Sequence, residues 1–347
     1  MKLNTIDGAF LMSQPLRPPN FVVDTLIAQG LHILAGSPKV GKSWLALWLA
    51  VTVAKGEPVW GMHTQQGTTL YLCLEDSVLR IQNRLFEITE DAPPNVHFCT
   101  ECAPIGQGLE EQIESFVSEH PGTVLIIIDT LQMIRGAGYD NTYANDYRDL
   151  SVLKHIADAH GIAILLIHHL RKMNDDDPMN MISGTTGLSG ATDSNFVLRK
   201  SQRRENTATL YCTGRDIPYR ELVLEFDGED HVWKLLSDDC EQKEQPNERI
   251  LFLLSELLRR QPEISAPAKA LLEKIDPAGA EGLTRLILQS VAALSKIGIS
   301  AVVRRSNGKR LIELRRAESD DAQGTQAVDP IDPADVSGGE NAPCFGV

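Results

Sequence analysis

The sequence predicts an α/β domain built around a mainly parallel sheet, and three observations lead to this fold class. Short apolar runs alternate with segments of helical length through the first part of the chain. Two of the runs, residues 124–128 and 163–167, contain no polar residue, as expected of strands that are buried on both faces. A loop bounded by glycines joins the first apolar run to a helical segment, and such a loop directs backbone N–H groups towards a phosphate.

The elements of this domain follow one another in chain order, each predicted by its apolar pattern. Asp76 or Ser77 stands where it would cap the second helix. No long helices separate the last three strands, so we expect these strands to form an antiparallel extension of the parallel sheet. The expected strands are residues 31–34, 68–74, 124–128, 163–167, 196–198, 208–212 and 222–226, and the expected helices are 43–54, 78–89 and 149–160.

A smaller second domain is expected after the polar segment at residues 237–247, which we interpret as a linker. Three helical segments followed by a two-stranded hairpin is the order of elements in a winged helix. The turn Ser306-Asn307-Gly308 separates the two strands. The expected helices are residues 248–260, 267–275 and 283–297, and the expected strands are 301–304 and 310–315.

The two ends of the chain carry little periodic pattern. The N-terminal residues are rich in proline and predict an arm, whereas the C-terminal residues contain few large apolar side chains and predict a disordered acidic tail. The expected organisation is an arm at 1–20, an α/β domain at 21–236, a linker at 237–247, a winged-helix-like domain at 248–316 and a tail at 317–347.

The composition is that of a soluble globular protein, with 42% hydrophobic and 23% charged residues. No apolar run reaches the roughly 20 residues that span a bilayer, and the N-terminus lacks the layout of a signal peptide. These features predict a cytoplasmic protein without a membrane partner. Cys99 and Cys102 form a lone CxxC with no second pair at zinc-finger spacing, so we expect free thiols.

The strongest motif is the glycine-bounded loop, which has the GxxxxGKS spacing of a phosphate-binding loop. Its two glycines allow the tight turn, Lys42 supplies a cation for the β- and γ-phosphates of ATP, and Ser43 supplies a hydroxyl for Mg²⁺. Lys39 either adds a second cation or faces solvent. The expected nucleotide-binding residues are Gly36, Ser37, Pro38, Lys39, Val40, Gly41, Lys42 and Ser43.

Polar side chains stand at the ends of three apolar strands. Asp129 ends VLIIID and either holds Mg²⁺ through water beside the phosphate loop or caps the next turn. Glu75 ends TLYLCLE and is either the general base that activates a water or an exposed strand end. His168 and His169 end AILLIHH, and we expect one of them, preferably His169, to contact the γ-phosphate rather than to be an ordinary surface residue.

Two later features are candidates for contacts with nucleic acid or with a second subunit. The connection at residues 171–194 is long for an α/β domain, and loops of this length are usually functional or disordered. Arg215 follows a late strand. It is either an arginine finger that enters the ATP site of a neighbouring chain or an ordinary surface arginine.

The formal charge of −14 argues against a nucleic-acid-binding protein when it is taken over the whole chain, but charge acts locally. Residues 246–316 contain 13 Lys and Arg against 7 Asp and Glu, whereas residues 317–347 contain 7 acids and no base. The basic hairpin is a candidate contact for duplex DNA. The alternative is a hairpin that solubilises its domain or docks on the acidic α/β domain. The candidate DNA-binding residues are Arg304, Arg305, Lys309 and Arg310.

With these residues in this order, residues 20–235 resemble the RecA-like hexameric helicases, and among them most resemble the plasmid RepA-like P-loop ATPases. The resemblance implies a RecA-like P-loop NTPase core and a hexameric ATPase ring. It further implies ATP and Mg²⁺ at the subunit interfaces and single-stranded DNA in a central channel. It implies that Gly36, Lys42 and Ser43 bind phosphates and Mg²⁺, that Glu75 activates water and that Asp129 supports the metal. It also implies that His169 or His168 senses the γ-phosphate, that Arg215 is a trans-acting finger and that Arg84 contacts adenine.

The chain departs from this family in its channel loops, which are often basic in such helicases. Here one loop carries Asp175, Asp176 and Asp177, and residues 135–148 are nearly neutral. The resemblance, with Glu75 and the histidine pair favouring hydrolysis, predicts an ATP-dependent DNA helicase or DNA-translocating ATPase in the replication of a plasmid or other mobile element. The acidic channel loop favours the alternative, a recombinase-like or regulatory DNA-binding ATPase that uses ATP as an assembly switch without unwinding.

Overall fold

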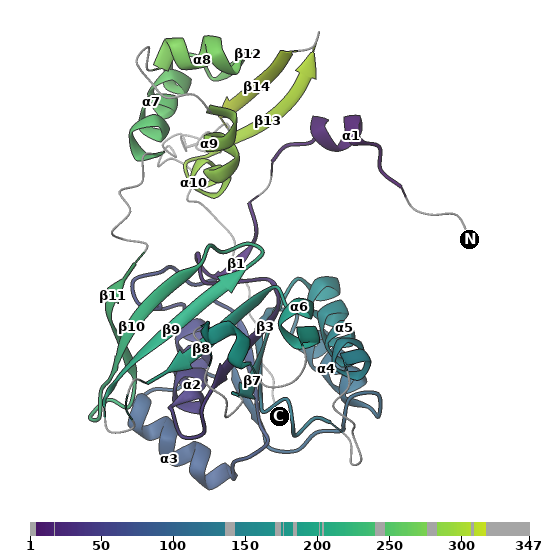
Figure 1. Cartoon of the computed structure of the whole chain (residues 1–347), viewed down its shortest axis with the longest axis vertical. Helices are drawn as coiled ribbons and strands as arrows, with labels where there is room; N and C mark the ends of the chain where they lie inside the picture. The colour runs from purple at the N-terminus through teal and green to yellow at the C-terminus, as the bar shows by residue number, and fades with distance from the viewer. Residues whose placement is uncertain are drawn as a thin grey trace, which may run out of the picture. The chain divides into compact units, whose positions relative to one another are not determined.

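The structure is a computed structural model in which two compact units are distinguished (Figure 1). One unit is Arg17–Glu248, and the other combines Met1–Leu16 with Arg249–Val347. The residues that the structure describes are 5–16, 18–135, 143–170, 175, 177–182, 186–200, 202, 205–239, 247–275, 283–306 and 309–316. The expected tail at 317–347 lies outside these residues, as do the turn residues 307–308 and most of the expected linker.

The larger unit contains a nine-stranded sheet in the order β11-β10-β9-β8-β3-β7-β6-β4-β5 (Figure 1). A separate two-stranded sheet is formed by β1 (Phe21–Val23) and β2 (Ile27–Ala28). The strands of the large sheet are β3 (Gly30–Gly36), β4 (Thr68–Cys73), β5 (Val96–Cys99), β6 (Thr123–Asp129), β7 (Ala163–His169), β8 (Ser194–Arg199), β9 (Thr207–Gly214), β10 (Arg220–Phe226) and β11 (Trp233–Asp238).

Six neighbouring strands, from β8 to β5, are parallel, and β9, β10 and β11 extend the sheet antiparallel. The expected mainly parallel core is therefore confirmed. The expectation that β8 belongs to the antiparallel extension is wrong, because β8 pairs with β3 in parallel. The reason lies in the connection from β7 to β8, which was expected to be a long loop. It contains the 3-10 helix η1 (Pro178–Met181) and helix α6 (Thr186–Ala191), so the chain crosses over and returns in the same direction.

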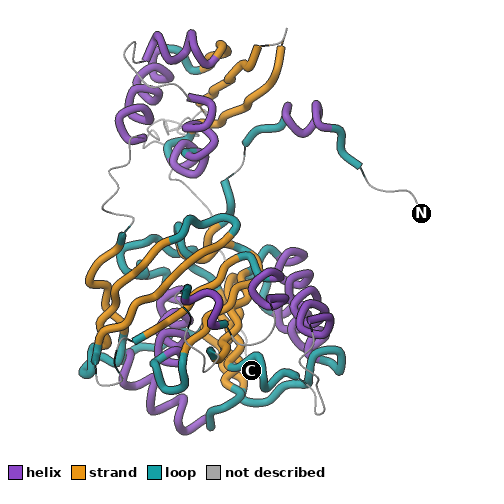
Figure 2. Tube along the Cα trace, viewed as in Figure 1, coloured by secondary structure: helices purple, strands orange, loops and turns teal. Residues whose placement is uncertain are grey.

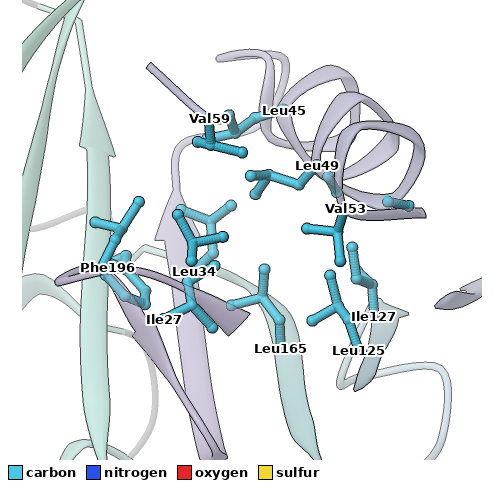
Figure 3. Packing of buried hydrophobic residues seen from close by; sticks show 14 of the residues in the cluster. Ile27, Leu34, Leu45, Leu49, Val53, Val59, Leu125, Ile127, Leu165 and Phe196 are labelled. Atoms are coloured by element: carbon cyan, nitrogen blue, oxygen red, sulfur yellow. The ribbon is translucent and has the colours of Figure 1, made fainter. Parts of the chain in front are cut away.

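Helices cover both faces of this sheet. One face carries α2 (Lys42–Lys55) and α3 (Val78–Ile88), and the other carries α4 (Leu109–Glu119), α5 (Tyr143–His160) and α6. Figure 3 shows the first face, where Leu45, Leu49 and Val53 of α2 pack over side chains of the central strands. The strands there alternate between two separate cores, because successive side chains point to opposite faces.

The smaller unit has its own core and the element order of a winged helix. Its elements are α7 (Asn247–Arg260), β12 (Glu263–Pro267), α8 (Ala268–Ile275), α9 (Leu283–Gln289), α10 (Val291–Lys296), β13 (Ile299–Ser306) and β14 (Lys309–Arg316). β12 is an additional strand that pairs with β14. The single helix expected at 283–297 is instead two helices that meet at Ser290, which is buried.

Two element boundaries differ from the expected domain limits. β11 continues to Asp238, whose buried carboxylate accepts a hydrogen bond of 2.9 Å from Nε of Arg220, so the polar segment begins inside a strand. The expected arm includes helix α1 (Gly8–Ser13), which Asp7 caps by accepting from the backbone N–H of Phe10. After α1, the backbone N–H of Leu16 donates to the carbonyl of Ala301 on β13 at 2.8 Å. This N-terminal segment is therefore part of the smaller unit.

The tube representation separates the helical layers from the strands of each unit (Figure 2). Among the described residues, no helix is both long enough and apolar enough to cross a bilayer.

Candidate functional site

The phosphate-binding loop joins the end of β3 to the start of α2, as the sequence predicts. Space is tight at both of its glycines. A Cβ at Gly36 would lie 2.9 Å from the carbonyl oxygen of Leu198, and a Cβ at Gly41 would lie 2.8 Å from the ring of Trp233. Gly41 also has a φ of +108°, which favours glycine. Both positions therefore require the residue that the motif places there.

The side chains of the loop differ in exposure. Ser37, Pro38 and Lys39 are exposed, and Lys39 adopts a φ of +62°. Val40 is buried in the core beneath α2. Among the residues that the structure describes, Lys39 makes no ion pair, so its charge is available to solvent or to a ligand.

Lys42 is folded back into the loop, where its Nζ donates to the carbonyl oxygens of Gly36 at 2.8 Å and Ser37 at 3.2 Å. Burial lowers the pKa of its ammonium group to about 8, although the nearby carboxylates of Asp129 and Glu75 act in the opposite direction. A buried ammonium held only by carbonyl oxygens is poorly neutralised. Bound phosphates would supply the negative charge that this amine lacks.

Ser43 and Asp129 lie together beside the loop, on the side of the sheet that faces α2. The hydroxyl of Ser43 donates to Oδ2 of Asp129 at 2.7 Å, and the hydroxyl of Tyr71 donates to the same oxygen at 2.9 Å. Burial raises the pKa of Asp129, while these two hydrogen bonds lower it. A hydroxyl and a carboxylate oxygen that converge are suitable ligands for Mg²⁺. The donor set therefore fits the metal expected from the sequence.

Glu75 lies just beyond β4, next to the strand that ends in Asp129, because Cys73 pairs with Asp129. Its side chain is exposed, and its Oε1 accepts a hydrogen bond from the hydroxyl of Thr130 at 3.0 Å. This contact orients the carboxylate at the carboxyl edge of the sheet. The position expected for Glu75 from the sequence thus agrees with the strand pairing.

The two histidines at the end of β7 face opposite sides of the sheet. His169 pairs with Gly36 at the start of the phosphate loop and lies on the α2 side, as do Asp129 and Tyr71. His168 is buried on the α5 side. The Nδ1 of His169 is buried and has no hydrogen-bond partner within the described part of the chain. Strand parity therefore places His169, and not His168, on the same face of the sheet as Asp129.

A cluster of aromatic side chains borders the loop and was not predicted from the sequence. Trp44, in the first turn of α2, lies under the guanidinium of Arg84 at 5.4 Å and beside the ring of His231 at 4.8 Å. Asp76 holds Arg84 and also pairs with Arg80 at 2.7 Å. Arg84 is therefore positioned over a flat aromatic surface next to the phosphate loop.

Trp233 fixes the other side of the loop. It is buried, its Nε1 donates to the carbonyl of Gly41 at 3.2 Å, and Lys200 lies over its ring at 5.3 Å. Trp60 in turn donates to the carbonyl of Trp233 at 2.7 Å. The local sequence gives no sign of this role, because Trp233 and Gly41 are brought together only by the sheet.

Arg215 lies at the edge opposite the phosphate loop. It follows Gly214, which pairs with Ser194 at the start of β8, where the parallel strands begin. Its side chain is 60% exposed and pairs with Asp193 at 3.2 Å. The strand β3 between this edge and Gly36 measures roughly 17 Å at about 3.3 Å per residue. Arg215 is therefore remote from the phosphate loop of its own chain.

The acidic residues in the connection from β7 to β8 serve local structure. Asp177 caps η1 by accepting from the backbone N–H of Met179 at 2.9 Å, and Asp175 accepts from the backbone N–H of Asp177 at 2.9 Å. Asp176 lies outside the described residues. The segment at residues 135–148, expected to be the first channel loop, is partly helical, because α5 begins at Tyr143. At its start, Arg135 is buried and pairs with Asp146 at 2.7 Å.

The candidate DNA-binding residues lie on the hairpin of the smaller unit. Arg305 pairs with Arg310, and Ser306 with Lys309, at the end of the hairpin next to residues 307–308. Arg304 is half exposed and forms an ion pair with Glu313 on the neighbouring strand. The backbone thus brings three of the four basic positions to the tip of the hairpin, and Arg304 lies one residue further in.

Cys99 and Cys102 lie at the edge of the large sheet beside α4, and both are free thiols. Together with Leu72, Phe98 and Phe116 they line a cavity of about 290 Å³. Within the described ranges, no group of three or more His, Cys, Asp or Glu side chains is arranged to hold a metal ion. Neither cysteine is thus part of such a cluster.

Comparison with known proteins gives one family and similar solved structures. Residues 2–175 match the family described as AAA domain (AAA_25). A solved structure described as an ATPase domain superposes with a TM-score of 0.51 at 16% identity, over 60% of this chain and 85% of that chain. A DnaB-like replicative helicase, solved in a study of its interactions with primase, gives the same TM-score and identity over 60% of this chain and 58% of its own. No curated protein matches the sequence.

The expected RecA-like core is confirmed by these structures, which share its fold. The family match spans half of the 347 residues and includes the phosphate loop, Glu75, Asp129 and both strand-end histidines. The chain therefore belongs to the AAA domain family of P-loop ATPases.

Proposed function

We propose that this chain is an ATP-dependent DNA helicase or DNA-translocating ATPase that acts as a ring-shaped homo-oligomer, most simply a hexamer. One observation carries the proposal: the residues for ATP hydrolysis meet at one edge of the sheet, while Arg215 is exposed at the opposite edge. Because Arg215 is remote from the phosphate loop of its own chain, it can act at an ATP site only in a second copy. Two solved structures of the same fold are an ATPase domain and a DnaB-like replicative helicase, which supports this choice.

Each residue at the loop edge has a task in hydrolysis. The loop N–H groups and Lys42 bind the phosphates, and Ser43 and Asp129 hold Mg²⁺, which neutralises charge on the phosphates when it is bound. Glu75 takes the proton from the attacking water, since its carboxylate is exposed and already oriented by Thr130. His169 contacts the γ-phosphate, and Arg84 with Trp44 forms the surface for adenine.

Two features support DNA as the partner of this ATPase. The resemblance to plasmid RepA-like ATPases supports single-stranded DNA in a central channel and a role in replicating a plasmid or other mobile element. The basic hairpin of the smaller unit supports an additional contact with duplex DNA, because Arg305, Lys309 and Arg310 stand at its tip.

The deciding experiment measures ATP hydrolysis with and without single-stranded DNA, together with unwinding of a forked duplex. We expect DNA to stimulate hydrolysis and ATP to drive strand separation. Glu75→Gln is the control, since it should bind ATP and DNA but fail in both reactions. Hydrolysis that DNA does not change, with no strand separation, would exclude a helicase.

A second candidate is a DNA-binding regulator in which ATP switches assembly. The observation in its favour is that Asp175 and Asp177 of the expected channel loop are used in local turns and add negative charge. For such a switch, Glu75→Gln should retain every DNA-dependent property of the native protein as long as ATP is present. The same assays therefore separate the two candidates.

The hairpin is tested in the full-length chain by replacing Arg304, Arg305, Lys309 and Arg310 with alanine. We expect weaker binding to duplex DNA and a shallower dependence of affinity on salt, because each lost phosphate contact reduces the slope by about 0.9. Lys269→Ala with Lys274→Ala is the matched control, since both lysines are exposed and belong to α8 of the same unit rather than to the hairpin. An unchanged salt slope in the quadruple variant would leave the hairpin as a solubilising or docking element.

A further inference from the structure

A buried carboxylate at the far edge of the sheet has no task in the hydrolysis described above. Asp193 precedes β8 and is 6% exposed. Its Oδ2 accepts from the backbone N–H of Leu31 at 2.8 Å and pairs with Nζ of Lys154 at 2.7 Å. Its Oδ1 accepts from the guanidinium of Arg215 at 3.2 Å. Both carboxylate oxygens of Asp193 thus have partners, and the partner of Oδ1 is Arg215, the proposed finger.

The backbone strengthens this connection. The N–H of Arg215 donates to the carbonyl of Asp193 at 2.8 Å, and the N–H of Asp193 donates to the carbonyl of Leu31 at 2.7 Å. Arg215 is therefore attached to Asp193 through its main chain and its side chain. Asp193 is attached in turn to the first residues of β3, the central strand that ends in the phosphate loop.

Space around the carboxylate is restricted. A Cβ at Gly30 would lie 2.3 Å from Oδ2 of Asp193, and Gly30 has a φ of +129°. Gly30 therefore leaves room for the carboxylate to enter the sheet edge. Lys154, on α5, also pairs with Asp158 at 2.6 Å. Burial alone would lower the pKa of Lys154, but its two carboxylate partners raise it, so the lysine remains a cation beside Asp193.

The guanidinium itself remains largely accessible. A guanidinium carries five N–H groups. Arg215 donates one of them to Asp193 and another to the carbonyl of Gly190 at 3.3 Å. Its side chain is 60% exposed. It has no further partner among the described residues, so the remaining N–H groups can meet an external anion. An arginine side chain that is fixed at one end loses fewer conformations when it binds such an anion.

We infer that Asp193, supported by Lys154, is a positioning residue that holds Arg215 in the pose needed at the ATP site of the neighbouring subunit. This inference rests on the proposed function, because it assumes that Arg215 acts in trans. Asp193 is itself buried at the edge remote from the phosphate loop, so it does not touch ATP and acts on the neighbouring site through Arg215.

The first test is the steady-state ATPase activity of full-length Asp193→Asn, a variant of nearly the same shape that lacks the charge. We expect kcat to fall about 10- to 100-fold with little change in KM for ATP, because a misplaced group near the chemistry costs up to about 10²-fold. In an Arg215→Ala background the same substitution should cause no further loss. Asp158→Asn is the control, since it also removes a carboxylate from Lys154 but does not contact Arg215. An additive loss in the double variant would overturn the inference.

The second test uses mixed oligomers, which separate a trans effect from general damage. Asp193→Asn subunits retain an intact phosphate loop, and Lys42→Ala subunits retain an intact Asp193–Arg215 pair. Mixing them should restore activity at interfaces that combine the two intact halves. A loss that mixing cannot restore, alongside successful rescue of Arg215→Ala, would show that Asp193 acts within its own subunit and would overturn the inference.

The outcomes also distinguish this inference from the proposed function. If Arg215→Ala itself is not rescued by Lys42→Ala, the trans-acting finger fails and the inference fails with it. If Asp193→Asn does not fold, Lys154→Met takes its place, because it removes one support and leaves the carboxylate present. It should give a smaller loss of kcat with the same rescue, and a full kcat would count against the inference.

Discussion

Buried charged groups have different partners at the two edges of the large sheet. At the loop edge, Lys42 bonds to carbonyl oxygens and Asp129 accepts from hydroxyls. Burial therefore lowers the pKa of Lys42 and raises the pKa of Asp129, which favours the neutral form of each group. At the opposite edge, Asp193 meets Lys154 and Arg215 directly, and the carboxylates around Lys154 raise its pKa. The first edge is incomplete without a charged ligand, whereas the second is already neutralised. The difference indicates where ligand chemistry occurs and where a side chain is merely held.

The largest effect is expected at the incomplete edge. Lys42→Ala removes the buried cation of the loop and should reduce ATP hydrolysis by about 10³-fold or more. Lys39→Ala is the matched control, because Lys39 belongs to the same loop but is exposed. Measured turnover near the native rate in Lys42→Ala would contradict the whole assignment of the site, and equal losses in both variants would remove the distinction between them.

Glu75→Gln comes next. It retains the shape of the side chain and the hydrogen bond with Thr130 but loses the basic oxygen, so hydrolysis should fall by about 10²- to 10⁴-fold while ATP binding persists. Single-turnover hydrolysis together with nucleotide binding by fluorescence would separate the two steps. A native rate would mean that the base lies elsewhere at this edge.

The uptake of protons on ATP binding tests the lowered pKa of Lys42 at the loop edge. The pKa of Lys42 is lowered to about 8, so part of this amine is neutral at pH 8 to 9 before ATP binds. Bound phosphates should raise the pKa, and binding should therefore take up protons in this range but not at pH 6. Titration calorimetry in buffers with different ionisation enthalpies measures this uptake. An uptake of the same size at both pH values would show that Lys42 is charged throughout.

The smallest expected effect concerns adenine. Arg84→Ala should raise KM for ATP a few-fold, since a cation over an aromatic ring contributes about 1 kcal/mol. Arg80→Ala tests the same ion-pair partner, Asp76, without contact to Trp44 and should leave KM unchanged. A larger effect from Arg80 than from Arg84 would place adenine away from Trp44.

Local sequence predicted the parts of the site that stand directly at the end of an apolar strand. The phosphate loop, Asp129 and the histidines each follow an apolar strand, and parallel strands bring such ends to one edge. Local sequence could not predict Trp233 beside Gly41, because strand order is set by long-range packing rather than by periodicity. The helix α6 was missed for a related reason: its small, polar residues carry no apolar stripe, and among its described side chains only Leu188 is fully buried.

The hydrogen bond between Leu16 and Ala301 has a consequence for the order of folding during synthesis. The segment that carries Leu16 leaves the ribosome before the α/β unit, yet its binding partner on β13 is made long after that unit is complete. Leu16 therefore has no partner on β13 while the α/β unit is being made. The smaller unit gains its last contact only when both ends of the described chain are present, so an isolated C-terminal fragment would leave that edge of β13 without Leu16.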